Sequence, residues 1–307
     1  MIKKYNSVND GYNNTYSYTT EKIKFDFYDF AILDNENLSY ENKVNYFTRI
    51  PNNFIRKNLS KEYGLNRIFL IVYIIIDRNR TYEDISYISI GDVLRSCGYK
   101  TTKTKPKLFY EIIKCLLFLK ENNFIEVDFD IYSLSYNDLI RVKIISQNFD
   151  VTTNFTKIYG KDVDVILNSN TTLNRESIIV TFLYINSYIG CRSKQDNGSE
   201  KQDAKDNPEA FYKSIVNMSK DLSMSKDTIN QCIEYLTKST DERDALLIKR
   251  EVGSVQPDKA KPPQNVPNIY VLNKEGYEQE IKWAIEKIID LYKTDEIYPF
   301  VKGNNQK

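Results

Sequence analysis

Histidine is absent from this sequence of 307 residues. A Ser-His-Asp triad and a Cys-His nucleophile are therefore impossible, and the usual imidazole ligands of catalytic zinc are missing. Cysteine is scarce, since Cys97, Cys115, Cys191 and Cys232 lie far apart with no Cys-x-x-Cys pair. This spacing predicts neither a zinc site nor a disulfide framework, and we expect free thiols in a reducing compartment.

The glycine motifs that bind phosphate groups are also absent. The sequence contains no Gly-x-x-x-x-Gly-Lys-Ser/Thr and no Gly-x-Gly-x-x-Gly. Acidic pairs such as Asp162 and Asp164 are interpreted as solvated loop charges, because nothing places three or four carboxylates together in an apolar frame. We therefore expect no catalytic residue, no metal and no cofactor, and we predict that the protein is not an enzyme.

Long apolar runs are missing. The longest, residues 68–76, is about half of what a membrane span requires, and no apolar signal region follows Met1-Ile2-Lys3-Lys4. We predict a cytoplasmic protein with no membrane partner. The net charge is only +1, so any attraction to nucleic acid must come from local patches of charge.

Residues 214–272 carry the clearest local pattern. Two groups of residues at helical spacing occur here: Ser214, Ile215, Met218 and Leu222, and then Ile229, Cys232, Ile233 and Leu236. Ser225 is placed to cap the second helix, so that the pair indicates a helix-turn-helix. Strand-like residues 245–250 and 268–272 follow, separated by a loop at 253–264 that contains Gly and Pro. Together these elements predict a winged helix; the alternative is an irregular three-helix core beside a hairpin.

An internal repeat links this region to the preceding part of the chain. Three matches share one offset of 108 residues: Phe47-Thr48-Arg49-Ile50 with Phe155-Thr156-Lys157-Ile158, Leu65-Asn66-Arg67 with Leu173-Asn174-Arg175, and Ile71-Val72 with Ile179-Val180. A second constant offset aligns Ile112, Cys115, Leu116 and Leu119 with Ile229, Cys232, Ile233 and Leu236. Any two amphipathic helices share apolar spacing, but the shared Phe-Thr-basic-Ile and Leu-Asn-Arg motifs favour a duplication.

The first copy is expected to repeat the same order of elements. Helices are predicted at residues 68–77, 89–97 and 106–119, and a wing at residues 124–127 and 140–144. The predicted fold is mainly α with small β-hairpin wings, in tandem winged-helix domains. The expected divisions are an N-terminal arm (1–45), a first domain (46–150), a second domain (151–273) with a mobile loop (190–209), and a C-terminal helix and tail (274–307). Residues 46–150 and 151–273 are named the N-terminal and C-terminal segments.

Candidate DNA contacts follow from the placement of basic and amide side chains. In the N-terminal segment, a stretch without acidic residues falls at the turn and start of the third helix, where cations neutralise backbone phosphates. In the C-terminal segment, amide side chains on the exposed face of the second helix are suited to form hydrogen bonds with adenine. Cations of the wing are suited to contact the phosphate backbone of the DNA on either side. The alternative is ordinary solvated surface. The candidate residues are Arg95, Lys100, Lys103, Lys105, Lys107, Ser225, Lys226, Thr228, Asn230, Gln231, Lys249, Arg250, Lys259 and Lys261.

This duplicated pattern, with Phe-Thr-Arg-Ile-Pro at residues 47–51 and Asn-Ile-Tyr-Val-Leu at residues 268–272, resembles replication initiators of bacterial plasmids and phages. It also resembles the winged-helix domain of primosomal helicase-loading proteins. The resemblance to initiators implies tandem winged helices that bind repeated origin sequences and recruit host replication proteins, with one domain often used to form a homodimer. The chain departs from rolling-circle initiators, which need a histidine-based metal site beside their nicking tyrosine.

We therefore expect a sequence-specific protein that binds double-stranded DNA at repeated sites, as a replication initiator of a plasmid or phage. A winged-helix transcriptional repressor or partition protein is the alternative within DNA binding. A protein-interaction module that binds no DNA is the alternative from another class.

Overall fold

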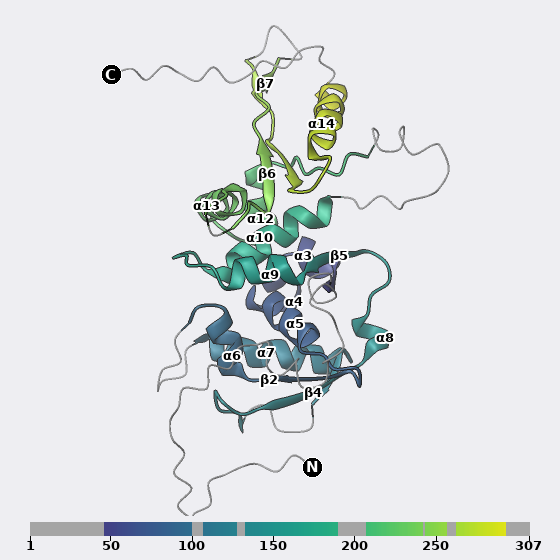
Figure 1. Cartoon of the computed structure of the whole chain (residues 1–307), viewed down its shortest axis with the longest axis vertical. Helices are drawn as coiled ribbons and strands as arrows, with labels where there is room; N and C mark the ends of the chain where they lie inside the picture. The colour runs from purple at the N-terminus through teal and green to yellow at the C-terminus, as the bar shows by residue number, and fades with distance from the viewer. Residues whose placement is uncertain are drawn as a thin grey trace, which may run out of the picture.

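The structure is a computed structural model that describes residues 46–99, 107–127, 133–189, 207–241, 243–256 and 262–292. Within these ranges, helices combine with small antiparallel sheets (Figure 1), which confirms the predicted combination of helices and β-hairpins. The predicted arm at 1–45, Pro106, Cys191 and most of the predicted loop at 190–209 lie outside the described residues.

The N-terminal segment is built around one central helix. α5 (Ile68–Arg78) is buried from Ile68 to Asp77, as befits a helix that is apolar on almost every side. The elements before it are β1 (Phe47–Pro51), α3 (Asn52–Arg56) and α4 (Leu59–Tyr63). The elements after it are β2 (Ile85–Ile88), α6 (Ile90–Ser96), α7 (Lys107–Glu121), β3 (Ile125–Val127) and β4 (Ile140–Ile144). The three predicted helices and both predicted wing strands are present, with ends that agree within two residues where they are described.

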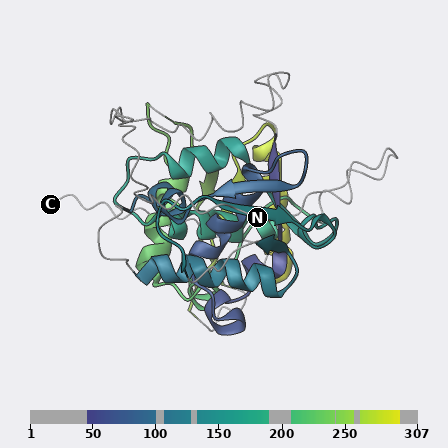
Figure 2. The same cartoon turned by 90° about the horizontal axis from the view of Figure 1, so that it is seen from below.

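A three-stranded antiparallel sheet closes one end of the molecule. β4 lies between β2 and β3, with Ser86 opposite Val142 and Glu126 opposite Lys143. This end faces the viewer in Figure 2. The chain therefore runs helix, strand, helix, helix, hairpin, with the strand that precedes the second helix pairing with the last strand of the hairpin.

The C-terminal segment has the same order of elements. After α8 (Ser146–Phe149) it contains β5 (Phe155–Tyr159), α9 (Gly160–Leu167), α10 (Arg175–Tyr188), α12 (Ile215–Leu222), α13 (Lys226–Thr237), β6 (Leu247–Arg250) and β9 (Ile269–Leu272). β6 pairs with β9, and Phe211, which precedes α12, forms a β-bridge with Tyr270 of β9. Phe211 therefore takes the place that β2 has in the N-terminal segment.

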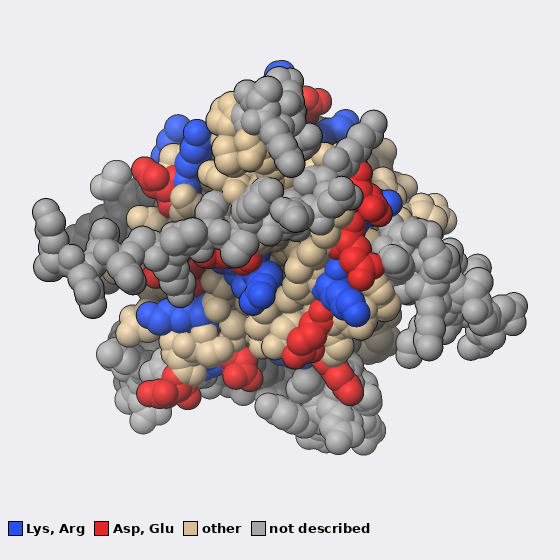
Figure 3. Space-filling view, turned by 90° about the horizontal axis from the view of Figure 1, so that it is seen from above, with Lys and Arg blue, Asp and Glu red and all other residues tan. Residues whose placement is uncertain are grey.

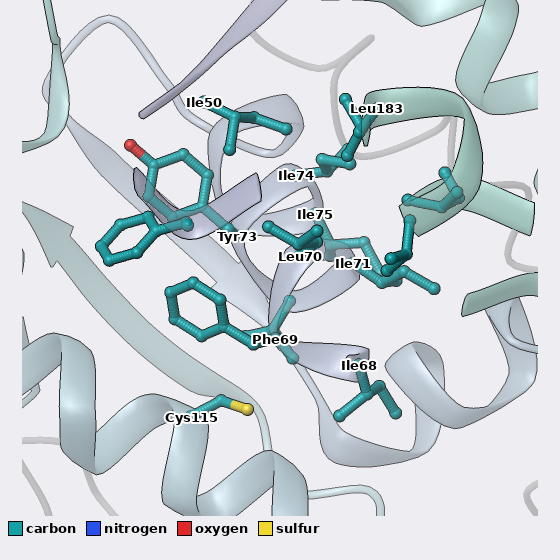
Figure 4. Close-up of a cluster of buried hydrophobic side chains, with 14 of the residues drawn as sticks. Ile50, Ile68, Phe69, Leu70, Ile71, Tyr73, Ile74, Ile75, Cys115 and Leu183 are labelled. Carbon is teal, nitrogen blue, oxygen red and sulfur yellow. The ribbon is translucent and has the colours of Figure 1, made fainter. Parts of the chain in front are cut away.

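The two segments meet through corresponding elements. β1 pairs antiparallel with β5, and the middle pair of this ladder is Arg49 opposite Lys157, two residues that match at the offset of 108. α5 packs against α10, and both bury most of their length. Figure 4 shows Leu183 of α10 beside Ile74 and Ile75 of α5, with Cys115 of α7 below them. Most buried residues of both segments form one continuous hydrophobic core, and the predicted divisions of the chain stay predictions.

The predicted loop at residues 253–264 needs a correction. β7 (Ser254–Val255) and β8 (Gln264–Asn265) pair within and beside it, so the hairpin of β6 and β9 is extended. Val255 is fully buried in a second apolar cluster against α14 (Tyr277–Tyr292), where Ala284 and Ile288 are buried. Sequence reasoning gave weight to the glycine and prolines and overlooked the valines that flank them.

Asp162 and Asp164 also differ from their interpretation as solvated loop charges. Both lie on helix α9, and Asp164 forms an ion pair with Arg78 of α5 at 2.9 Å. Burial raises the pKa of the Asp162 carboxyl to about 6. The polar sequence of residues 160–164 masked a short amphipathic helix that covers α10.

Candidate nucleic-acid interface

Three serines mark the ends of α12 and the start of α13. Ser214 Oγ accepts a hydrogen bond from the amide of Asn217 and caps α12. Ser223 adopts a left-handed conformation with φ of 50°, which ends α12. Ser225 Oγ accepts from the amide of Thr228 at 3.0 Å, so the predicted cap of the second helix is confirmed.

The exposed face of α13 carries the amides that were expected to read bases. Ile229, Cys232, Ile233 and Leu236 are buried, as predicted, while Lys226, Asn230 and Gln231 are exposed. Thr228 is half-buried, and its hydroxyl lies 2.8 Å from Ser225 Oγ, so these two side chains stabilise the start of the helix. Glu234, one turn beyond Asn230, is also exposed and adds a negative charge to this surface.

Of the two cations on β6, Lys249 and Arg250, the first forms an ion pair with a neighbouring carboxylate. Lys249 is exposed and pairs with Glu251 at 2.9 Å, and Arg250 beside it is exposed. Lys259 and Lys261 lie outside the described residues. Where described atoms are visible in Figure 3, cationic and anionic side chains alternate over this end of the molecule. The surface there has no uniform sign of charge.

Two of the five predicted basic residues of the N-terminal segment are described. Arg95 of α6 pairs with Asp92, whose carboxylate also accepts from Ser89 Oγ at 2.6 Å. Lys107 is exposed at the first residue of α7. Lys100, Lys103 and Lys105 lie outside the described residues.

Each turn that precedes a third helix is contacted by the opposite segment. Arg175 of α10 donates to the carbonyls of Ser96 at 3.3 Å and Ser169 at 2.9 Å, and so reaches the end of α6. In the other direction, Asn58 Nδ2 donates to Ser223 Oγ in the turn between α12 and α13. These contacts fix the two helix pairs relative to each other.

A buried carboxylate completes the contact at the first turn. Tyr99 Oη donates to Glu176 Oε1 at 2.7 Å, and burial together with this carboxylate raises the pKa of Tyr99 well above its usual range. The phenol is therefore protonated and serves as a donor. Glu176 Oε2 is buried and finds no hydrogen-bond partner among the described residues.

Sequence reasoning missed Arg175 as a contact between segments. The available signal was its place in the repeated Leu-Asn-Arg motif, which the repeat analysis used only to align the copies. The matching residue, Arg67, lies on the wall of a cavity between the two segments. The arginine that recurs at the start of each central helix thus marks the interface between the two segments.

No model of a known protein family matches the sequence, and no curated protein matches it at a significant level. In the part of the chain that the structure describes, no helix is long and apolar enough to cross a membrane. The same part holds no group of three or more Cys, Asp or Glu side chains arranged to bind a metal ion.

Proposed function

We propose that the chain contains tandem winged-helix units, derived by duplication, and that it binds double-stranded DNA in a sequence-specific manner. The observation that carries this proposal is the order of helix, β-paired residue or strand, helix, helix and hairpin in both segments. In the N-terminal segment β2 pairs with the last strand of the hairpin, and in the C-terminal segment the single residue Phe211 forms a β-bridge at the corresponding place. A further feature supports it: the antiparallel pairing of β1 with β5 about Arg49 and Lys157, which match at the offset of 108.

In this proposal the start of α13 enters a major groove. Asn230 and Gln231 are exposed amides that bond bidentately to adenine, and Lys226 is placed to contact a phosphate one turn earlier. Ser225 and Thr228 hold the helix end, whose amide groups favour a nearby phosphate. Lys249 and Arg250 of the hairpin, together with Arg95 and Lys107 of the N-terminal segment, extend the contact along the backbone.

The role we propose is that of a non-enzymatic replication initiator of a plasmid or phage, with DNA repeats and host replication proteins as partners. Two units that are fixed by Arg175 and Asn58 suit a site with two half-sites at a set spacing. A homodimer and a cytoplasmic location belong to the same proposal. A repressor or partition protein is separated from an initiator by testing whether the gene and its flanking repeats replicate a marker plasmid.

The decisive test begins with selection of bound sequences from random duplex DNA. On the selected site, the double variant Asn230→Ala with Gln231→Ala should lose about 1–3 kcal/mol of binding free energy and relax base preference at one position. Lys226→Ala should instead weaken binding to all sequences and lower the salt slope by about one. Gln279→Ala, an exposed amide on α14, is the matched control and should change nothing.

The non-DNA alternative has one observation in its favour. The net charge is only +1, and opposite charges alternate on the face shown in Figure 3, as on many protein-docking surfaces. If selection enriches no sequence and binding to duplex DNA is not salt-dependent, the DNA proposal is overturned and the interaction module takes its place.

A further inference from the structure

A cavity of about 350 Å³ lies between the two segments. Its wall is formed by α4, by the residues that precede α4 and α5, by one face of α7, and by Leu222 and Ser223 of the C-terminal segment. The volume falls within the range of small-molecule sites, which is about 300–1,000 Å³. The cavity therefore has room for a small ligand or for a group that protrudes from a larger one.

The charges on this wall are unbalanced. Four cations line the cavity, namely Lys57, Arg67, Lys107 and Lys114, against one carboxylate, that of Glu111. Glu111 lies 3.8 Å from Lys114 Nζ, at the limit of an ion pair. Lys57, Arg67 and Lys107 have no ion-pair partner among the residues that the structure describes. Like charges that share a cavity repel one another, and a bound anion would offset that repulsion.

The matching position in the other segment shows what such an arginine does when acceptors are present. Arg175 occupies the same place in the Leu-Asn-Arg motif as Arg67, and its guanidinium donates to two backbone carbonyls. The guanidinium of Arg67 has no such carbonyl partner among the described residues. Arg67 lines the cavity, and its positive charge also acts on the nearby phenol of Tyr99. The missing acceptor at Arg67 is thus of the kind that a ligand oxygen supplies.

We propose that this cavity binds a phosphate group. A guanidinium offers parallel donors that match two phosphate oxygens, and lysine ammonium groups add charge from several directions. A net excess of three positive charges on the wall suits a phosphate better than a singly charged carboxylate. The phosphate comes either from a free ester the size of a mononucleotide or from the backbone of a duplex that lies across both segments. Only the second source rests on the proposed DNA binding.

The first arm of the test uses the full chain with inorganic phosphate and with thymidine 5′-monophosphate, titrated by calorimetry. Arg67→Gln should weaken binding about tenfold or more, since a hydrogen bond to a charged group contributes about 1.5–3 kcal/mol and 1.4 kcal/mol is tenfold. Glu111→Gln removes the cavity's carboxylate and should tighten binding. Lys120→Gln, exposed on the same helix but outside the cavity, is the matched control.

The second arm measures the same variants on duplex DNA. If the duplex is the source, Arg67→Gln and Lys114→Gln weaken DNA binding and lower the salt slope, Glu111→Gln strengthens binding, and Lys120→Gln has no effect. Lys114 is exposed, so its variant remains informative if Arg67→Gln fails to fold. The proposal is overturned if the folded variants equal the wild type in both arms. Failure of the DNA arm alone overturns only the duplex source and leaves the first arm to decide.

Discussion

Arg67 and Arg175 occupy matching positions in the two segments, yet their surroundings differ. Arg175 is bound to the carbonyls of Ser96 and Ser169, and it stands next to the buried Glu176. Arg67 lines a cavity whose other charged residues are mostly cations. The comparison shows that one arginine bonds a carbonyl of the other segment, whereas its counterpart lines the cavity that we propose to bind phosphate.

A second matched pair, Arg56 and Asp164, differs in charge but connects the segments on both sides. Arg56, which follows β1, donates to Ser187 of α10 and stacks over Tyr188. Asp164, its counterpart after β5, forms an ion pair with Arg78 of α5. Both residues connect one segment to the central helix of the other, although their charges are opposite. The two segments therefore share an arrangement of backbone elements, but the side chains at matched positions differ in charge and in the contacts that they make.

The largest expected effect tests the two arginines directly. Arg175→Ala should lower the free energy of unfolding by about 2–4 kcal/mol, because two hydrogen bonds from a charged donor are lost and carbonyls are left unpaired. Arg67→Ala should change it by about 0.5 kcal/mol or less, because Arg67 is half-buried and makes no side-chain hydrogen bond or ion pair with a described residue. Urea denaturation followed by circular dichroism measures both, and equal losses would contradict the contrast between the two sites.

Much of the fold followed from the sequence because local signals agreed with tertiary packing. Ser225 caps α13, and the apolar positions Ile229, Cys232, Ile233 and Leu236 are all buried, so cap and periodicity pointed to the same helix. Arg49 and Lys157, which match at the offset of 108, lie opposite each other in the ladder of β1 and β5. The repeat in the sequence did not predict that its two copies would pair in this way.

The remainder depended on contacts between residues far apart in the chain. Helix α9 was missed because Lys161, Asp162 and Asp164 dominate its first turn, whereas its buried residues Val163 and Ile166 are too few to show a periodic pattern. The cavity was missed for a related reason. Of its four cations only Lys107 belongs to the basic stretch seen in the sequence, and Lys57, Arg67 and Lys114 come from separate parts of the chain.

The next comparison concerns the two turns that precede the third helices. Gly98 has φ of 85°, and a Cβ there would lie 2.6 Å from Arg175 Nη1, so Gly98→Ala should cost about 1–3 kcal/mol of stability. Ser223 adopts a similar left-handed conformation with a side chain. Ser223→Gly removes both the strain of that conformation and the oxygen that accepts from Asn58, so the free energy of unfolding should change by less than about 1 kcal/mol. Thermal unfolding measures both. If Gly98→Ala leaves the stability unchanged, Arg175 moves aside at no cost. The conformation of the turn would then be independent of the contact between the segments.

The smallest expected contrast is between Cys115 and Cys232, which match at the second offset and are both fully buried. Burial raises the pKa of the Cys115 thiol above its usual range and that of Cys232 to about 11. Both thiols should therefore resist alkylation in the folded protein and react after unfolding. Rapid labelling of one thiol in the native state would break the equivalence of α7 and α13.

Serine variants sharpen the same comparison. A serine hydroxyl can bond the carbonyl four residues earlier at either site. Only at Cys232 does a neighbouring hydroxyl, that of Thr181, offset part of the rise in pKa that burial causes. Cys115→Ser should therefore cost about 1–2 kcal/mol more than Cys232→Ser, because its hydroxyl is buried among apolar side chains with fewer partners. The alanine variants of both positions serve as controls, since they remove the sulfur without adding a polar group. Equal losses for the two serine variants would mean that Thr181 stays bonded to the carbonyl of Ser177 and offers nothing to residue 232.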